Sequence, residues 1–352
     1  MKKLAIGVDI GGINTAFGLV DENGDLYAES VISTKKYPYV DDYPAYVEDL
    51  CDSMRALAQS LSFEYELTGI GIGAPNANYH KGTIETPANL WKFKEGDPNP
   101  DESRRVFPLA DDISKCFGGV KTLITNDANA ATIGEMIYGN AKGMRDFIMI
   151  TLGTGLGSGF VANGEMVYGH DGFAGEFGHM VTHAEGLPCG CGQRGCFERY
   201  ASASALVRQA QRLDPSLDSG RAIFRRLREP RVKAVVDSWL REIVYGLASL
   251  IHLWDPDCLA LCGGVMQQSY PVEQLKALVP KSVMPAYRSR GVGTYLVSLL
   301  KKEIIARGAI PFYGTSLSNY HSWNIAINSG FYPAWVEIAA TKKPPAQRPE
   351  DR

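Results

Sequence analysis

One group of residues in the sequence has the spacing of a structural metal site. His179 is followed by Cys189, Cys191 and Cys196 in the pattern H-x9-C-x-C-x4-C. One imidazole and three thiolates complete the tetrahedral shell that Zn²⁺ prefers in structural sites. The glycines among these residues supply the tight turns that so short a chelate requires. The pattern therefore predicts a zinc ion that stabilises the fold and leaves no open position for catalysis. Three buried free thiols would fit poorly in so polar and glycine-rich a stretch.

Acidic residues stand near this predicted site. Glu176 and Glu198 flank it, and a metal that fixed both would suit the binding of several hydroxyls of one ligand; otherwise they are exposed acids. Asn126-Asp127 lies further upstream, between a predicted strand and a predicted helix. A carboxylate at that junction can accept a proton from a substrate hydroxyl. It can equally be the N-cap of the helix.

Glycine-rich turns occur twice, each directly after a predicted strand. The first is Asp9-Ile10-Gly11-Gly12, and the second is the stretch GTGLGSG at 153–159. Glycines let backbone N–H groups approach phosphate oxygens, and an aspartate beside them can hold Mg²⁺ through water. One such turn is more simply a tight turn, but its repetition favours phosphate binding. The sequence contains no G-x-x-x-x-G-K-[ST] pattern, which excludes a P-loop enzyme.

The elements around the two turns form the same supersecondary unit, about 140 residues apart. Each unit reads strand, glycine turn, strand, Asn-Gly turn, strand. The strands are expected at 4–10, 16–20 and 25–33 and again at 147–151, 158–162 and 165–168. Such a repeat predicts two similar α/β lobes with a ligand cleft between them.

Strands are also expected at 67–72, 120–125 and 258–261, and a loop at 76–101. Helices are expected at 43–61, 108–117, 128–138, 202–213, 222–228, 231–254 and 272–278.

Composition narrows the class of protein. The chain has 352 residues, 45% of them apolar, which predicts more than one domain with a real core. A net charge of −3 argues against a nucleic-acid partner. No apolar run reaches transmembrane length, and the N-terminal residues do not read as a signal peptide. Clustered cysteines suggest metal rather than disulfides. We therefore expect a cytoplasmic protein without a membrane partner.

The motifs DIGG, GIGAP, NDANAA, LGTGLGSG, GEFGHM and CGCGQRGCFE together resemble the ROK family of sugar kinases and regulators, most closely its bacterial glucokinases, over residues 3–280. The resemblance implies an actin-like ATPase fold of two ribonuclease-H-like lobes around a cleft. It implies ATP and Mg²⁺ as well as zinc, a hexose (glucose first) phosphorylated on its primary hydroxyl, and a homodimer. It also implies that Asp127 is the catalytic base.

The remaining site residues come from the same resemblance. The implied sugar ligands are Gly73, Asn89, Asn126, Asp127, Glu176, His179 and Glu198. The implied ATP contacts are Asp9, Gly11, Gly12, Asn14, Thr15, Gly153, Thr154, Gly155, Gly263 and Gly264. Asn14 and Thr15 enter because Ile13 stands where the family usually has threonine, so that a hydroxyl or amide contact to phosphate must come from them.

The chain departs from the resemblance after Pro280. Residues 283–337 resemble part of a GNAT-type N-acetyltransferase, with a pyrophosphate-type loop at 285–294 followed by a helix to Arg307. The expected domains are therefore 1–120, 121–282 with the zinc site, an atypical α/β segment at 283–341, and a disordered tail at 342–352. Two alternatives to the kinase stay open: a non-catalytic sugar-binding protein, and an acyl-CoA-dependent acetyltransferase acting through the C-terminal segment.

Overall fold

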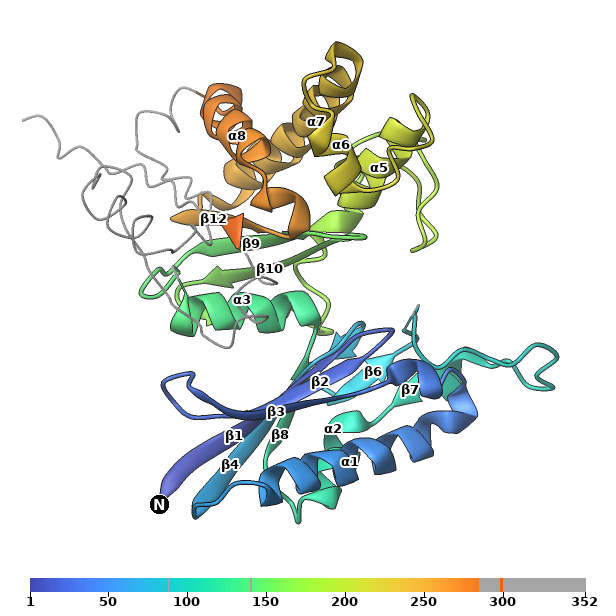
Figure 1. Ribbon diagram of the computed structural model, residues 1–352, viewed down its shortest axis with the longest axis vertical. Coiled ribbons are helices and arrows are strands. Elements are labelled where there is room, and N and C mark those ends of the chain that lie inside the picture. The colour runs from blue at the N-terminus through green and yellow to red at the C-terminus, as the bar shows by residue number, and fades with distance from the viewer. Residues whose placement is uncertain (88, 140, 285–297, 300–352) are drawn as a thin grey trace, which may run out of the picture. The chain divides into compact units, whose positions relative to one another are not determined.

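The computed structural model describes residues 1–87, 89–139, 141–284 and 298–299 (Figure 1). The chain divides into two compact units. Unit 1 comprises Met1–Gly134 and Tyr168–Ala174, and unit 2 comprises Glu135–Val167 and the chain from Gly175 onward. Unit 1 therefore contains a short segment that is far from the rest of it in the sequence.

Unit 1 is built on a five-stranded sheet in the order β3-β2-β1-β4-β8. Its strands are β1 (Lys2–Ile10), β2 (Thr15–Val20), β3 (Leu26–Ile32), β4 (Tyr65–Gly73) and β8 (Thr122–Thr125). The first three are antiparallel, whereas β4 and β8 run parallel to β1. Strand β1 alternates strictly, with Leu4, Ile6, Val8 and Ile10 all buried, which is the period of a strand whose one face meets a core. Helices α1 (Tyr43–Gln59) and α2 (Leu109–Cys116) also belong to this unit.

A second, small sheet in unit 1 was not predicted. Strands β5 (Ala77–Asn78), β6 (Thr83–Glu85) and β7 (Val106–Phe107) pair in an antiparallel meander. Two of them lie within the stretch 76–101 that was expected to be loop. Its core-facing residue Ile84 is fully buried, and Phe107 packs at 4.6 Å between ring centroids against the buried Trp91.

Unit 2 repeats the topology of the first sheet, in the order β11-β10-β9-β12-β13. The strands are β9 (Phe147–Leu152), β10 (Leu156–Ala162), β11 (Glu165–Met166), β12 (Cys258–Cys262) and β13 (Ser298–Leu299). Again the first three are antiparallel and β12 runs parallel to β9. Both Asn-Gly turns have glycine at positive φ, +87° at Gly24 and +85° at Gly164. The predicted repeat is confirmed, and with it the α/β fold.

In the described part of unit 2, five helices follow the zinc-type cluster in the sequence: α4 (Glu198–Ala201), α5 (Ala203–Gln211), α6 (Gly220–Arg225), α7 (Pro230–Trp254) and α8 (Ser269–Ser282). The 25-residue α7 contributes a buried face that includes Trp239, Leu240 and Leu247. Helix α3 (Asp127–Tyr138) begins in unit 1 and ends in unit 2. Among the described residues, none of the helices combines the length and apolarity needed to cross a membrane.

The C-terminal prediction needs one correction. Ser298 and Leu299 form a strand that pairs in parallel with Leu261 and Cys262 of β12. The helix expected over these two residues is therefore wrong there, because they extend the sheet of unit 2. The remainder of the acetyltransferase-like interpretation of 283–337, apart from Val283 and Met284, and the predicted tail at 342–352 lie outside the described residues.

Candidate functional site

In unit 1, several predicted site residues meet where parallel strands end. Asp9 pairs with Gly73, and Gly73 pairs with Thr125, the residue that precedes Asn126. Because the carboxyl ends of parallel strands share one edge of a sheet, this register brings Asp9, Gly73 and the Asn126-Asp127 pair together. A ligand site outside the carboxyl ends of strands is the usual arrangement in α/β folds.

Asp127 is the first residue of α3 and is exposed. The backbone N–H of Ala128 donates to Oδ1 of Asn126 and to Oδ1 of Asp127, at 2.8 Å in each case. The pair therefore caps the helix, as one of the two sequence interpretations expected. Capping does not exclude proton transfer, since a carboxylate has two oxygens and a helix N-terminus favours negative charge.

Two glycines near Asp127 allow neighbouring segments of the chain to come close together, because a side chain at either position would be crowded. A Cβ at Gly73 would lie 3.0 Å from the Cβ of Ala130 and 3.7 Å from the Cα of Asp127. A Cβ at Gly12 would lie 3.4 Å from the Cβ of Asn89. Within unit 1, the first glycine turn is therefore next to the predicted sugar-side residue Asn89, and the predicted sugar-side residue Gly73 is next to Asp127.

The first glycine turn is closed by backbone bonds. The N–H of Gly11 donates to the carbonyl of Asn14 (2.9 Å), and the N–H of Lys35 donates to that of Ile13 (3.2 Å). Thr15, which was expected to offer its hydroxyl to phosphate, is instead fully buried. Its Oγ1 lies 2.9 Å from both Thr34 Oγ1 and Tyr46 Oη, so that the hydroxyl is already satisfied in the core. Asn14 is exposed, and the predicted side-chain contact falls to it.

In unit 2, the predicted metal ligands come together. The ligand atoms of His179, Cys189, Cys191 and Cys196 all lie within 4.8 Å of one another. Cys191 Sγ is 3.6 Å from Cys196 Sγ, and Cys189 Sγ is 3.7 Å from His179 Nδ1. Ligands about 2.3 Å from a tetrahedral zinc ion stand about 3.8 Å apart, so the four residues fit this metal.

The surroundings of the three thiols shift their pKa values in different directions. Burial is the main cause that raises the pKa of Cys189 to about 12, and hydrogen bonding to Glu198 contributes. Burial also raises the pKa of Cys196. Burial acts to raise the pKa of Cys191 as well, but hydrogen bonds from the Gln193 backbone and with the Cys189 and Cys196 thiols outweigh it, so that the pKa of this thiol is lowered. These sulfurs stand in one cluster with backbone donors around it, as a closed metal site requires.

Glu198 links the metal cluster to the second glycine turn. Its Oε1 is 3.0 Å from Cys189 Sγ, and its Oε2 accepts from the N–H of Leu156 at 3.4 Å. A Cβ at Gly155 would lie 2.8 Å from the same Oε2. The turn 153–155 and the cluster are thus adjacent within unit 2, with Glu198 between them. Glu176, the other predicted acid, is exposed and precedes the single turn Phe177–His179.

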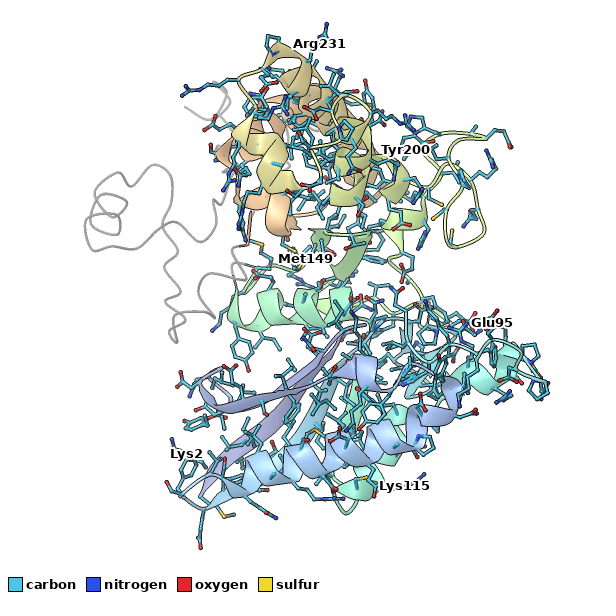
Figure 2. All side chains as sticks on the ribbon, turned by 45° about the vertical axis from the view of Figure 1, so that its right-hand side comes forward. Lys2, Glu95, Lys115, Met149, Tyr200 and Arg231 are labelled. Carbon is cyan, nitrogen blue, oxygen red and sulfur yellow. The ribbon has the colours of Figure 1, made fainter. Side chains whose placement is uncertain are left out.

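Tyr200 packs against the loop between His179 and Cys196, a role that no sequence motif indicated. Its ring stacks on that of His183 with centroids 3.8 Å apart, and its hydroxyl accepts from the N–H of Leu187 at 2.7 Å. The residue is labelled in Figure 2, where it lies beside the loops of unit 2. An aromatic residue four positions after the last cysteine gives no signal of this role in the sequence, since the hydrogen bond joins residues that are 13 positions apart.

Gly263 and Gly264 follow β12, and the first lies against the start of the second glycine turn. Gly263 has φ +118°, and a Cβ there would overlap the backbone of Leu152, the residue before Gly153. At Gly264, by contrast, no atom lies within 4 Å of the position that a Cβ would take. The two predicted nucleotide-side turns of unit 2 are therefore in close contact.

This difference predicts unequal effects of two alanine substitutions. Gly263→Ala introduces both a steric overlap and a strained backbone, which should lower the free energy of unfolding by about 2 kcal/mol or more. Gly264→Ala, one residue further on, should change it by less than about 0.5 kcal/mol. Urea unfolding of both variants beside the parent chain measures the two values, and equal losses would contradict the close approach at Gly263.

Comparison with known proteins is consistent with this geometry. Residues 5–310 match a family model described as the ROK family. The glucokinase of Streptomyces coelicolor is 33% identical over 287 residues, which cover 75% of this chain and 83% of that protein. A xylose repressor of Bacillus subtilis is 26% identical over 273 residues, covering 76% and 66%. The match to the family model continues past residue 280, so the resemblance extends further than the motifs indicated.

A solved structure of a ROK family protein is also similar to this chain. The ROK family glucokinase of Streptomyces griseus, in complex with glucose and AMPPNP, superposes with a TM-score of 0.62 at 32% sequence identity. The superposition covers 80% of this chain and 90% of that one.

Proposed function

The chain belongs to the ROK family. From this premise we propose that it is a kinase that transfers the terminal phosphoryl group of ATP to the primary hydroxyl of a hexose, with glucose as the preferred acceptor. The observation that carries the proposal is the position of Asp127 beside the Asp9–Gly12 turn, at the shared end of β1, β4 and β8. A proton acceptor and a phosphate-type turn at one edge are what this reaction needs.

Asp127 is the proposed general base. Its carboxylate orients the attacking hydroxyl and accepts its proton as the bond to phosphorus forms. The adjacent Asn126 and the sugar-side residues Gly73 and Asn89 are proposed to bind the other hydroxyls, together with Glu176, His179 and Glu198 of unit 2. Polar residues of this kind discriminate between hexoses because a wrong sugar leaves some of them without a hydrogen-bond partner.

The two glycine turns are the proposed phosphate contacts. The N–H groups of Gly11 and Gly153 already donate within their own turns, to the carbonyls of Asn14 and Gly155. The proposed phosphate donors are therefore the backbone N–H groups of Gly12, Thr154 and Gly155 and the side chain of Asn14, while Gly11 and Gly153 shape the two turns. Asp9 is exposed at the end of β1, and a single carboxylate with water ligands suits Mg²⁺. When bound with ATP, Mg²⁺ neutralises the charge that develops on the phosphate oxygens. Gly263 and Gly264 are the proposed contacts on the adenosine side.

Glucose is favoured as the acceptor because the similar Streptomyces griseus enzyme was solved with glucose and AMPPNP. A coupled assay of ADP release tests this with glucose, mannose, fructose, allose and N-acetylmannosamine, each with a control that lacks sugar. We expect turnover with glucose at the highest kcat/KM. Turnover with none of the five would reject the kinase.

Size-exclusion chromatography with light scattering tests the homodimer that we also propose.

The similarity to a repressor supports one alternative, a sugar-binding protein without catalysis. It predicts that calorimetry detects glucose binding while the ADP assay stays at background. The kinase instead predicts both signals in the same preparation.

A further inference from the structure

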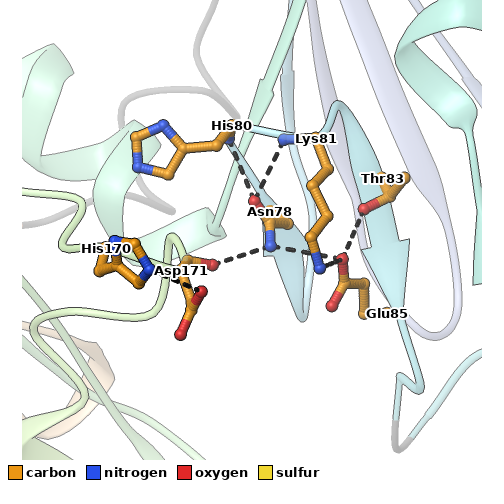
Figure 3. Close-up of polar contacts among 7 residues, drawn as sticks. All are labelled: Asn78, His80, Lys81, Thr83, Glu85, His170 and Asp171. Atoms are coloured by element: carbon orange, nitrogen blue, oxygen red, sulfur yellow. Dashed lines mark hydrogen bonds and ion pairs between the residues drawn. The ribbon is translucent and has the colours of Figure 1, made fainter.

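The segment Tyr168–Ala174 belongs to unit 1 although the residues on both sides of it belong to unit 2. It follows β11 and precedes Gly175-Glu176 in the sequence. Its partners are Asn78, the last residue of β5, and Tyr79 and His80, which begin the turn to β6. We call these three residues the anchor. Figure 3 draws Asn78 and His80 beside His170 and Asp171.

Each anchor residue holds the segment in a different way. Nδ2 of Asn78 donates to the carbonyl of Asp171 at 2.8 Å, and Nε2 of His80 lies 2.8 Å from the carbonyl of Gly169. The ring of Tyr79 stacks on that of Tyr168 with centroids 3.9 Å apart and planes within 2° of parallel. Two hydrogen bonds and one stacked pair thus join seven residues to a single turn.

Asn78 is preorganised for this contact. It is fully buried, and its Oδ1 accepts from the N–H groups of His80 and Lys81 at 3.1 and 3.2 Å. Its Nδ2 also lies 3.3 Å from Oε1 of Glu85, which receives further bonds from Lys81 and Thr83. A buried amide whose bonds are all made has one orientation, because rotating it would leave polar atoms unsatisfied. Figure 3 shows this network around the amide.

The segment contributes mainly backbone to the contact. The side chains of His170 and Asp171 are 98% and 77% exposed, whereas the carbonyls of Gly169 and Asp171 accept the two bonds from the anchor. Gly172 has φ +84°, and a Cβ there would lie 2.7 Å from Oδ1 of Asn78, so only glycine permits this approach. The segment is therefore shaped to fit the anchor.

The chain on the other side of Glu176 is held just as firmly. Ser158 of β10 donates its hydroxyl to the carbonyl of Gly175 and accepts from the N–H of Phe177 at 3.0 Å. Glu176 thus stands immediately beyond one fixed segment and inside a second fixed turn. The anchored segment on one side and the bonds to Ser158 on the other together leave Glu176 few backbone conformations, and such preorganisation lowers the entropy lost when a ligand binds.

We infer that Asn78, Tyr79 and His80 are positioning residues for the hexose, acting through the Tyr168–Ala174 segment on Glu176. The inference rests on the proposed function, since it takes Glu176 as a sugar ligand. Releasing the segment should weaken sugar binding and leave ATP binding nearly unchanged, because the proposed phosphate contacts lie elsewhere in the sequence.

His80→Ala is the main test, because His80 is exposed and the protein should fold without it. Loss of one hydrogen bond predicts an increase of about fivefold in the KM for glucose, with the KM for ATP within about twofold of the parent value. His80→Gln, which can donate from its amide, should restore much of the loss. Lys115→Ala removes an exposed ion pair with Asp112 in α2 and serves as the matched control, with no change expected.

Hydrogen exchange of the sugar-free protein separates the two premises. The N–H of Ala174 donates to the carbonyl of Tyr168 at 3.0 Å, so its exchange should accelerate in His80→Ala and in Tyr79→Ala. Unchanged exchange would overturn the anchor. Faster exchange with an unchanged KM for glucose would overturn its role in positioning Glu176. A parent protein that turns over no sugar would instead reject the proposed kinase, and exchange would still decide the anchor.

Discussion

Asp127→Asn should lower the kcat for hexose phosphorylation by about 10²- to 10⁴-fold, the usual contribution of a general base. Asparagine keeps the size of the side chain and one oxygen acceptor, so the bond from the N–H of Ala128 survives. The amide cannot accept the proton of the attacking hydroxyl. We therefore expect the affinity for glucose, measured by calorimetry, to change by no more than a few-fold while the rate collapses.

Another aspartate that accepts a backbone hydrogen bond at the start of a helical segment provides the control. Asp101 precedes the turn Glu102–Arg105 and accepts from the N–H of Ser103 at 2.9 Å. Asp101→Asn should leave kcat and both KM values at the parent level. A thermal melt of each variant then checks the fold. If Asp127→Asn kept its rate, the base would be another residue; if it lost glucose binding along with its rate, Asp127 would be a structural cap.

The sequence predicted most of the two large sheets because their signals are local. Strand β1 shows its alternation in nine residues, and the Asn-Gly turns fix the hairpins that follow both glycine turns. Their repetition was sufficient to infer two related α/β halves. The cluster of His179 and the three cysteines was also predicted from the sequence, because cysteine and histidine at short spacing have few structural explanations.

The features that the sequence did not reveal depend on contacts between distant residues. Strands β5 and β7 have two residues each, too few for any period to show. The burial of Thr15 follows from Thr34 and Tyr46, which lie 19 and 31 residues away. The return of Tyr168–Ala174 to unit 1 rests on Asn78, 93 residues from its partner Asp171. Only a three-dimensional structure places such pairs together.

Loss of the metal should have the second-largest effect, on metal content, thermal stability and the KM for glucose. In Cys191→Ser one of the four proposed ligands becomes a hydroxyl, which is a poor partner for zinc beside three softer ligands. We expect the zinc content to fall from about one ion per chain to near zero. The folded state then loses the stabilisation that ligand binding supplies, so its midpoint of thermal unfolding should decrease.

The kinetic consequence follows from Glu198. Its carboxylate lies 3.0 Å from Cys189 Sγ and 3.4 Å from the N–H of Leu156, so disorder in the cluster passes directly to a proposed sugar ligand and to the glycine turn. The KM for glucose should therefore rise about tenfold or more, in the range seen when partners around a metal site are removed. Cys116→Ser in α2, a partly buried thiol of unit 1, should retain both zinc and the parent KM. A Cys191→Ser protein that still carried one zinc ion per chain and bound glucose normally would show that these four residues do not form the metal site.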